Sequence, residues 1–431
     1  MKRKILITFF TFLSFWGYTQ NDSVKTKKER LDFARTYFEI GGTFLPSFTG
    51  KRLVNNVVSD FKNPASVIQY FTWGGFHFWG HTELYVNIPL AYKPFKNNNE
   101  ASSEILHSVT TGARFLPWAY KEKKLRPYIG ICWSALDFRQ KIKDANPPMQ
   151  SKDIMLTYDT GLLFGYRNFS LRLALNYFHD NKWEYPLSRT LKADIKTPTL
   201  GFQVGLLYSM DFSKRTDKET IDKWNSYPSL SRQSLGSTKF GDVFIGIGPS
   251  LSYTLYKSEY NQNNLPYLKS RLTSSSYFDI ALGYHFQRAG LFTALSFRNP
   301  RYETEGYGAK QTIRKTSLAF EINKYIIDYT GFTPFVGINV AYDKLKYTEN
   351  IAGNSRTLSF DNQLEPGITF GWDIQPGKNQ EALILRTNLR WYPFSSFRVD
   401  GKNFNFNQLE YNLIQAVLYP ERLKKKNNRI T

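Results

Sequence analysis

Residues 200–212 read LGFQVGLLYSMDF, and this stretch decides the fold class. Apolar side chains such as Phe202 and Val204 alternate with small or polar ones such as Gln203. Successive side chains of a β-strand point to opposite faces, so the stretch predicts a strand with one oily face and one mainly small or polar face. The same alternation recurs in residues 169–177 and 278–286.

Similar segments run along the whole chain and predict sixteen strands, while helical periodicity is scarce. No uncharged apolar run of 18 or more residues occurs that would predict a membrane-spanning helix. The predicted strands lie near residues 36–46, 66–73, 76–91, 104–120, 126–140, 153–166, 169–179, 197–212, 240–257, 274–287, 290–300, 313–328, 332–346, 359–374, 381–392 and 407–419.

The connections between these strands alternate between short and long. An outer-membrane barrel has short turns in the periplasm and longer loops outside, so the pattern predicts an all-β, transmembrane antiparallel barrel with periplasmic termini. Short turns are predicted at residues 74–75, 121–125, 167–168, 288–289, 329–331 and 375–380. Long polar loops are predicted at residues 47–65, 92–103, 141–152, 180–196, 258–273, 301–312, 347–358 and 393–406.

The composition of the 431 residues agrees with a membrane barrel. The single cysteine excludes an intrachain disulfide framework, and 41% hydrophobic residues is too many for a disordered chain. Aromatic residues make up 17% of the chain and include pairs at strand ends such as Trp391 and Tyr392, as in interfacial girdles. A soluble β-sandwich is the alternative. Its strands usually have about 5–6 residues, whereas the strands predicted here are long.

The N-terminus has the features of an export signal. Basic residues 2–4 precede an apolar run at residues 5–16, which is too short to span a bilayer. We predict a signal peptide over residues 1–19, cleaved before Gln20. Export makes the formal charge of +21 weak evidence for nucleic-acid binding, and lipid phosphates or an anionic solute are the better partners.

The chain resembles a duplicated eight-strand unit. The segment DTGLLFGY at residues 159–166 matches EPGITFGW at 365–372, and LRLALNYF at 171–178 matches LRTNLRWY at 385–392. Two architectures fit: one barrel of about 16 strands, which we prefer, or two tandem 8-stranded barrels. The predicted organisation is a signal peptide (1–19), a periplasmic segment (20–35), a first half (36–212), a periplasmic linker (213–239), a second half (240–419) and a basic periplasmic tail (420–431).

The short signal before Gln20 and the repeated Gly-x-aromatic strands resemble those of Bacteroidota-type outer-membrane β-barrel proteins. This resemblance implies a Gram-negative outer membrane, lipid around the barrel and insertion by the barrel-assembly machinery. Such barrels usually end on an aromatic residue, but here Tyr419 is followed by the basic tail. Either Tyr419 takes that role or the last strand is misplaced.

Motifs for chemistry are few. His77 and His81 lie four apart in a strand-and-turn region, which is not a face for metal ligands, and adjacent His107 and Ser108 would point to opposite sides of a strand. The sequence therefore predicts no catalytic residues, no metal site, no cofactor, no nucleic-acid partner and no enzymatic activity.

Charged residues at inward positions are the best indication of function. Charge at membrane depth is tolerated when it is paired or wet, so in a narrow barrel these residues would form buried ion pairs and in a wide one they would line a channel. If both halves face one lumen, Arg172, Arg386 and Arg390 form a basic stripe that favours anions. The candidate lumen-facing charges are Glu39, Arg114, Asp159, Arg172, Asp279, Arg298, Glu321, Glu365, Arg386, Arg390 and Glu410.

The leading functional hypothesis is therefore a porin-like passive channel for small hydrophilic or anionic solutes. The alternative is a non-conducting structural or docking barrel that binds a periplasmic or surface protein through its long loops or linker. A barrel-embedded lipid-modifying enzyme is the third and weakest hypothesis.

Overall fold

The computed structural model describes residues 35–427, apart from residues 55–56, 92–94, 98–100, 108, 135, 143–145, 149, 152–154, 180, 211–239, 257, 270, 329–331 and 375–381. The predicted signal peptide with its cleavage site, residues 20–34 of the predicted N-terminal segment and the predicted linker lie outside the described residues. Among the helices of the described residues, none is long and apolar enough to cross a membrane.

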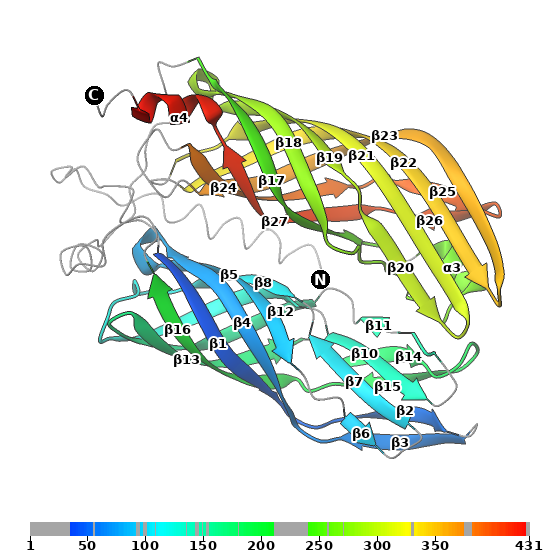
Figure 1. Ribbon diagram of the computed structural model, residues 1–431. Coiled ribbons are helices and arrows are strands. Elements are labelled where there is room, and N and C mark those ends of the chain that lie inside the picture. Colours follow the sequence, from blue (N-terminus) through cyan, green and yellow to red (C-terminus); the bar gives the residue numbers. More distant parts are fainter. Residues whose placement is uncertain are drawn as a thin grey trace, which may run out of the picture.

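Eight antiparallel strands of the first half form a closed barrel (Figure 1). The sheet closes because β1 pairs with the last strand of this half, β16, on one side and with β4 on the other. The strands are β1 (Arg35–Leu45), β4 (Ser66–His77), β5 (Thr82–Ala91), β8 (Thr110–Phe115), β9 (Leu125–Ser134), β12 (Met155–Tyr166), β13 (Phe169–Phe178) and β16 (Leu200–Met210).

Eight strands of the second half form a second ring. It closes because β17 pairs with β27 and β19 pairs with β21. A ninth strand, β20 (Arg301–Gly306), pairs with the first part of β21, beyond the part that pairs with β19. The ring strands are β17 (Asp242–Thr254), β18 (Tyr277–Phe286), β19 (Leu291–Arg298), β21 (Ala309–Tyr325), β22 (Phe332–Ile351), β23 (Asn354–Ile374), β24 (Leu383–Tyr392) and β27 (Gln408–Leu418).

The all-β antiparallel barrel with two similar eight-strand halves is confirmed, but the preferred single barrel of 16 strands is wrong. No ladder joins β16 to β17 in the part of the chain that the structure describes, and each half closes on itself. An eight-stranded barrel is just narrow enough for side chains to fill its lumen, so each half can be a closed folding unit. The segments whose sequences match lie at equivalent places in the two rings. Counted in chain order, β12 and β23 are the sixth strands of their rings, and β13 and β24 are the seventh.

Aromatic rings that point into the lumens rest on glycines of neighbouring strands. The ring of Tyr37 lies where a Cβ of Gly74 would be, and Tyr128 covers Gly161 in the same way. The turn predicted at residues 74–75 is therefore wrong: β4 continues to His77, and the turn is the 3-10 helix Phe78–Gly80. Further pairs are Gly41 with Tyr70, Gly112 with Tyr85, Gly165 with Tyr120, Gly283 with Phe244 and Gly371 with Phe335.

Replacing Gly161 with alanine is expected to lower the free energy of unfolding by about 1–3 kcal/mol, because it overpacks the lumen. The added methyl group would lie 2.6 Å from the Tyr128 hydroxyl oxygen and would also meet the carbonyl oxygen of Leu173. Urea unfolding in detergent micelles measures the loss. The matched control is Gly201→Ala, whose methyl would lie 3.2 Å from the nearest atom, a side-chain carbon of Leu45. Equal losses for the two variants would contradict this account.

The connections that the sequence predicts as long polar loops carry small sheets at the loop end of each barrel. Apolar residues such as Phe48, Phe61 and Ile195 hold the first of these sheets together in a buried cluster. One sheet contains β2 (Phe48–Val54), β3 (Val57–Asn63), β14 (Lys182–Pro186) and β15 (Lys192–Lys196); a second contains β6 (Phe95–Asn97), β7 (Ala101–His107), β10 (Leu136–Ile142) and β11 (Gln150–Ser151). The second barrel carries the hairpin β25 (Ser396–Val399) and β26 (Lys402–Asn405) and the helix α3 (Glu259–Asn264).

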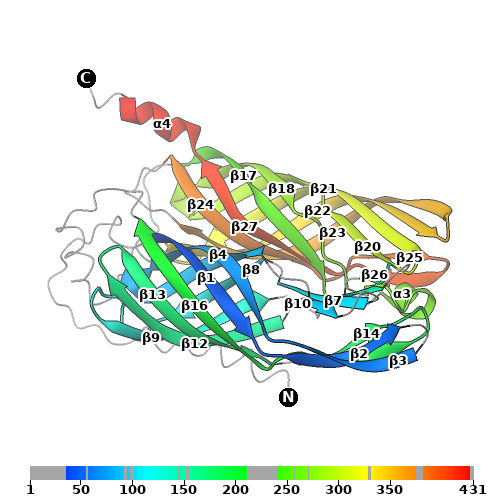
Figure 2. The same ribbon diagram turned by 60° about the horizontal axis from the view of Figure 1, so that its bottom comes forward.

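The two barrels lie side by side (Figures 1 and 2). Near their loop ends, the backbone N–H of Tyr307 donates to the carbonyl oxygen of Asn146 at 2.8 Å, and its hydroxyl donates to the carbonyl oxygen of Pro186 at 3.0 Å. Between the strands themselves, the hydroxyl oxygens of Thr111 on β8 and Tyr411 on β27 lie 3.1 Å apart. The faces of β8 and β27 are therefore turned toward each other rather than toward lipid.

The predicted last strand, residues 407–419, corresponds to β27, which ends at Leu418. Tyr419, the residue directly after β27, is buried with its ring centre 5.8 Å from that of Phe244. The first part of the predicted tail forms helix α4 (Pro420–Asn427), which Arg422 ties to the barrel through an ion pair with Asp242 at 3.0 Å.

Candidate functional site

The outer faces of both barrels expose large apolar side chains. On β13, Leu171, Leu173 and Leu175 are 44%, 47% and 40% exposed, whereas Arg172 and Ala174 between them are buried. Monomeric soluble proteins rarely expose apolar surfaces larger than a few hundred Å², whereas a membrane barrel presents such a belt to lipid. On the second barrel the belt includes Ile245, Ile247, Ile280, Leu282, Leu295, Phe297, Leu318, Phe320, Ile338, Val340, Ile368 and Phe370.

Five charged side chains form one network in the lumen of the first barrel. Arg172 pairs with Glu39 at 3.0 Å and with Glu83 at 2.7 Å. Arg114 pairs with the same Glu83 at 2.7 Å and with Asp159 at 2.5 Å. Each of the five residues is at most 4% exposed. Residues from strands β1, β5, β8, β12 and β13 thus meet in the middle of the barrel and block it with paired charge.

Apolar clusters close this lumen on both sides of the network. At the turn end, Phe76 and Tyr120 stack with ring centres 4.7 Å apart, and Leu116 is packed with them. At the loop end, Phe138 and Tyr185 pack edge to face with ring centres 4.8 Å apart. The charged layer therefore lies between two apolar plugs.

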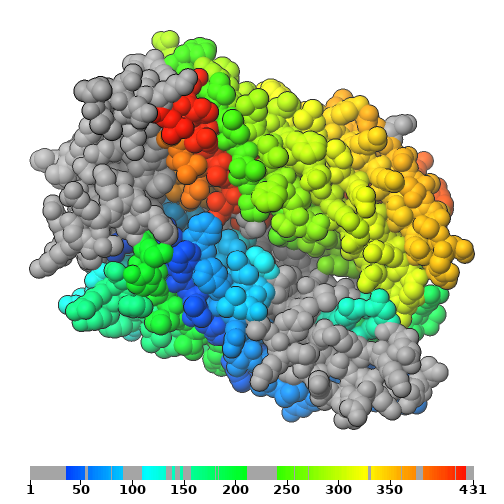
Figure 3. Space-filling view, in the orientation of Figure 1, coloured from blue at the N-terminus to red at the C-terminus, as the bar shows by residue number. Residues whose placement is uncertain are grey.

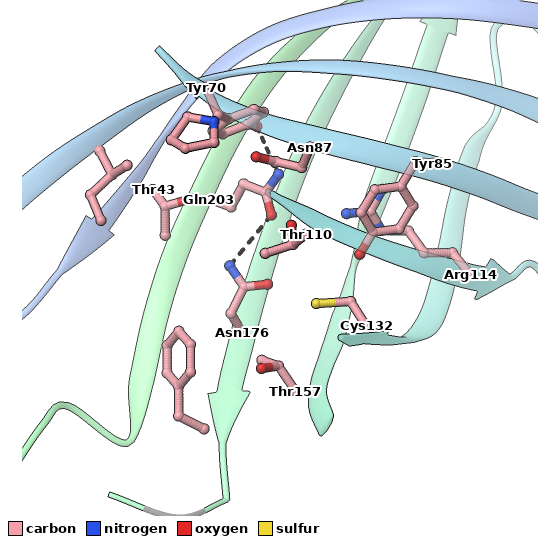
Figure 4. A pocket seen from close by; sticks show the side chains of 13 residues that line it. Thr43, Tyr70, Tyr85, Asn87, Thr110, Arg114, Cys132, Thr157, Asn176 and Gln203 are labelled. Carbon is pink, nitrogen blue, oxygen red and sulfur yellow. Dashed lines mark hydrogen bonds between the residues drawn. The ribbon is translucent and has the colours of Figure 1, made fainter. Parts of the chain in front are cut away.

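A small polar cavity remains between the network and the loop-end plug (Figure 4). Gln203 donates to the Tyr70 hydroxyl at 2.7 Å and accepts from Asn176 at 3.4 Å across this cavity, which Cys132 also lines. Its volume of about 40 Å³ has room for roughly three water molecules. A space of this size can hold water but not an organic solute.

The second barrel repeats the arrangement with more charges. Arg390 pairs with Asp279 at 2.5 Å and with Glu321 at 2.7 Å. In the next group Lys315 pairs with Asp343 at 2.7 Å and with Glu410 at 3.1 Å, while Glu410 also pairs with Arg298. Nearer the turn end, Arg386 pairs with Asp373 at 2.7 Å under an aromatic cluster that contains Phe244 and Tyr325. This lumen is filled as well.

The structure places all the candidate lumen-facing charges inside the barrels, at 5% exposure or less. The predicted basic stripe does not form, because Arg172 lies in one lumen and Arg386 and Arg390 lie in the other, each paired with carboxylates. The first barrel holds Glu39, Arg114, Asp159 and Arg172, and the second holds Asp279, Arg298, Glu321, Glu365, Arg386, Arg390 and Glu410.

Four members of the ion-pair networks described above were missed by the sequence analysis: Glu83, Lys315, Asp343 and Asp373. The signal for them was present in the alternation. Lys315 stands six residues before Glu321 on one strand, and Asp373 stands eight residues after Glu365 on another, so each shares the inward face of its neighbour.

No group of three or more side chains that could hold a metal ion occurs among the described residues. His77 is buried, and the Nδ1 atom of His81 lies 3.1 Å from the carbonyl oxygen of Leu116. Ser108, the neighbour of His107, lies outside the described residues.

No family model and no curated protein matches the chain. Solved structures similar to it include Neisserial surface protein A, at 12% identity and a TM-score of 0.30, over 41% of this chain and 96% of that one. OmpT of Vibrio cholerae has 6% identity and a TM-score of 0.17 over 92% and 100% of the two chains. An outer membrane channel from Pseudomonas putida F1 has 8% identity and a TM-score of 0.17 over 92% and 99%.

These similar structures are outer-membrane β-barrels. The scores are low, so the architecture of this chain rests on its own strand pairing and lipid-facing belt. This protein is a tandem membrane β-barrel. The predicted resemblance to Bacteroidota-type barrels in particular has no test among these comparisons and stays a prediction.

The prediction that the chain is not an enzyme is corrected. The similar structures include OmpT of Vibrio cholerae, and a fold-level likeness of this kind gives no ground for excluding enzymatic activity. The lack of a sequence motif does not exclude it either, because catalytic groups are recognised by their geometry. The comparisons assign no activity to this chain, and the prediction is withdrawn.

Proposed function

We propose that the protein is a non-conducting tandem barrel of the outer membrane whose ordered outer sheets bind a partner protein. The observation that carries the proposal is the closure of both lumens by paired charges between apolar plugs. In the first barrel, Arg172 with its partners fills the cross-section that a solute would need. This arrangement favours a docking role over the porin-like channel predicted from the sequence.

Side-chain contacts hold the elements at the loop end of the second barrel together, as in a platform for a partner. Arg356 bridges Glu349 at 2.9 Å and Asp400 at 2.8 Å, and the Tyr260 hydroxyl donates to Glu349 at 3.0 Å. Burial, together with the nearby Glu349 carboxylate, raises the pKa of Tyr260 to about 12. These contacts tie α3 to β22, β23 and the β25–β26 hairpin. Binding residues are commonly held on surface loops that a rigid scaffold positions.

The same end also joins the two barrels. Arg189 of the first barrel donates from Nε to the carbonyl oxygen of Tyr307 at 2.9 Å, next to the other hydrogen bonds of Tyr307. A partner would therefore meet one continuous surface built from both halves.

Recording in planar lipid bilayers tests the closed lumens. The refolded mature protein is expected to give no conductance steps, whereas a porin refolded by the same procedure serves as the positive control. Steps whose frequency rises with the amount of added protein would overturn the non-conducting role and restore the channel hypothesis.

Site-specific photocrosslinking in cells tests the docking role. A crosslinking residue at Lys51 or Arg398, both exposed at the loop end, is expected to capture one discrete partner protein. The matched control position is the exposed Lys124 at the turn end, where the same band should be absent. No loop-end band, or identical bands at all three positions, would count against the docking role.

A further inference from the structure

Three basic residues stand directly opposite one another on adjacent strands of the second barrel. Arg301 on β20 faces Arg314 on β21, which faces Lys346 on β22, and all three side chains are exposed. Arg301 has an ion pair with Glu303 at 2.5 Å, but Arg314 and Lys346 have no ion pair within the described residues. Like charges directly opposite in a sheet destabilise it, so an anion bound between Arg314 and Lys346 would stabilise this row.

The row lies at the upper border of the lipid-facing belt. Along β21 from Arg314 toward the turn end, the outward-facing residues Leu318 and Phe320 are apolar, and they are 45% and 50% exposed. Leu318 lies four residues from Arg314. On β22, Lys344 stands between Lys346 and the outward Tyr342, which is 49% exposed. At about 3.4 Å per residue, the cations lie within roughly 14 Å of the first apolar side chain. This is the level of lipid headgroups. The yellow part of the second barrel, to which β21 and β22 belong, forms part of the face drawn in Figure 3.

The first barrel carries a matching row, which makes an accidental alignment a poor explanation. Lys182 on β14 faces Lys196 on β15, which faces Thr49 on β2, which in turn faces Lys62 on β3. All four side chains are exposed. The belt strands β13 and β16 lie directly below this sheet, with Leu175, Tyr177, Leu200 and Phe202 exposed on them.

The strands of both rows approach the loop-end contact between the barrels, where the hydroxyl of Tyr307, next to β20, donates to the carbonyl oxygen of Pro186 on β14. The side chains of both rows stay exposed beside this contact. The other contact, of Thr111 on β8 with Tyr411 on β27, lies four strands from β16 in the first ring and four strands from β21 in the second.

We propose that the two rows bind the phosphate groups of a phosphorylated glycolipid in the outer leaflet, with its acyl chains lying on the apolar belt below. The proposal rests on the outer-membrane location in the proposed function. Arginine can hold a phosphate with two parallel hydrogen bonds and lysine adds a point charge, so a row of both suits a multiply charged headgroup. The basic rows border directly on the apolar belt, so one lipid molecule could contact both with its phosphates and its acyl chains. This favours a lipid over free phosphate as the ligand.

Binding to the full mature protein in neutral detergent micelles tests the proposal. The probes are a bis-phosphorylated lipid A, its dephosphorylated form and inorganic phosphate, and native mass spectrometry counts the bound molecules. The variant Arg314→Gln/Lys344→Gln/Lys346→Gln is expected to bind the phosphorylated lipid between about 10- and 100-fold more weakly than the wild type. The charge-matched control is Lys124→Gln/Arg167→Gln/Arg288→Gln, which removes three exposed charges at the turn end and should bind like the wild type.

Equal binding of the phosphorylated and dephosphorylated lipids to the wild type would overturn the proposal, as would equal binding of the phosphorylated lipid to wild type and variant. Inorganic phosphate that binds as tightly as the lipid would show an anion site without lipid specificity and would also overturn it. The exposed, mutually repelling side chains make folding of the variant robust, and Lys62→Gln/Lys182→Gln/Lys196→Gln on the first barrel is a second test. Bilayer conductance is read separately, so closed lumens and lipid binding can fail independently.

Discussion

Replacing Arg172 with leucine is expected to lower the free energy of unfolding of the first barrel by about 3–5 kcal/mol. Arg172 is fully buried and is the partner of both Glu39 and Glu83. Leucine would leave these two carboxylates in the lumen with less compensation, and an uncompensated buried charge costs several kcal/mol. Only Arg114 would remain to pair with Glu83.

Urea titration in lipid vesicles, read by the gel mobility of folded and unfolded protein, measures this loss. The control is Arg167→Gln, which removes an exposed arginine from the β12–β13 turn and should change stability by less than about 0.5 kcal/mol. The double variant Glu39→Gln/Arg172→Leu should recover part of the loss, because it removes one of the orphaned charges. A single variant as stable as the wild type would contradict the ion-pair account of the lumen.

Replacing Arg390 with leucine is expected to separate the unfolding of the two barrels into two steps. This change orphans Asp279 and Glu321 in the second lumen, again at a cost of about 3–5 kcal/mol, while the first lumen keeps its own network. Strand pairing does not pass from β16 to β17 in the described structure, so nothing in the ladders forces the halves to unfold together.

Proteolysis during a urea titration resolves the two steps. The fragment that holds the second barrel should become sensitive first, and the fragment that holds the first barrel should stay protected to the wild-type urea concentration. Arg288→Gln, an exposed change at the β18–β19 turn, is the control. Simultaneous loss of both fragments would indicate that the barrels unfold as one unit.

The strands of both barrels could be predicted from the sequence because lipid outside and side chains inside impose alternation on every strand. That pattern also identified buried residues such as Arg114 and Glu410, which share the inward parity of their strands. The number of barrels could not be read in this way. The number of barrels depends on whether β16 pairs with β1, far away in the chain, or with β17, which follows it. The alternation of apolar and polar residues along β16 is the same in both cases.

Two local features were also beyond the sequence pattern. The pair Gly74 and Gly75 looks like a turn, but Gly74 is needed inside a strand because the Tyr37 ring occupies the place of its missing side chain. The hairpin of β2 and β3 looks like a polar loop because its outward residues, such as Lys62, are charged, whereas Phe61 on the other face packs into a cluster formed by several connections. Both depend on residues far away in the chain.

The rings that rest on glycines in the lumens have a consequence for how these barrels can change over evolutionary time. A glycine such as Gly161 and its covering ring, Tyr128, share a single volume, so neither position can vary freely. A larger residue at one becomes acceptable only after a smaller one arises at the other, as in a swap of ring and glycine between neighbouring strands. Substitutions inside the lumen should therefore occur as coupled pairs. At the lipid-facing positions, single exchanges among leucine, valine and phenylalanine should be accepted.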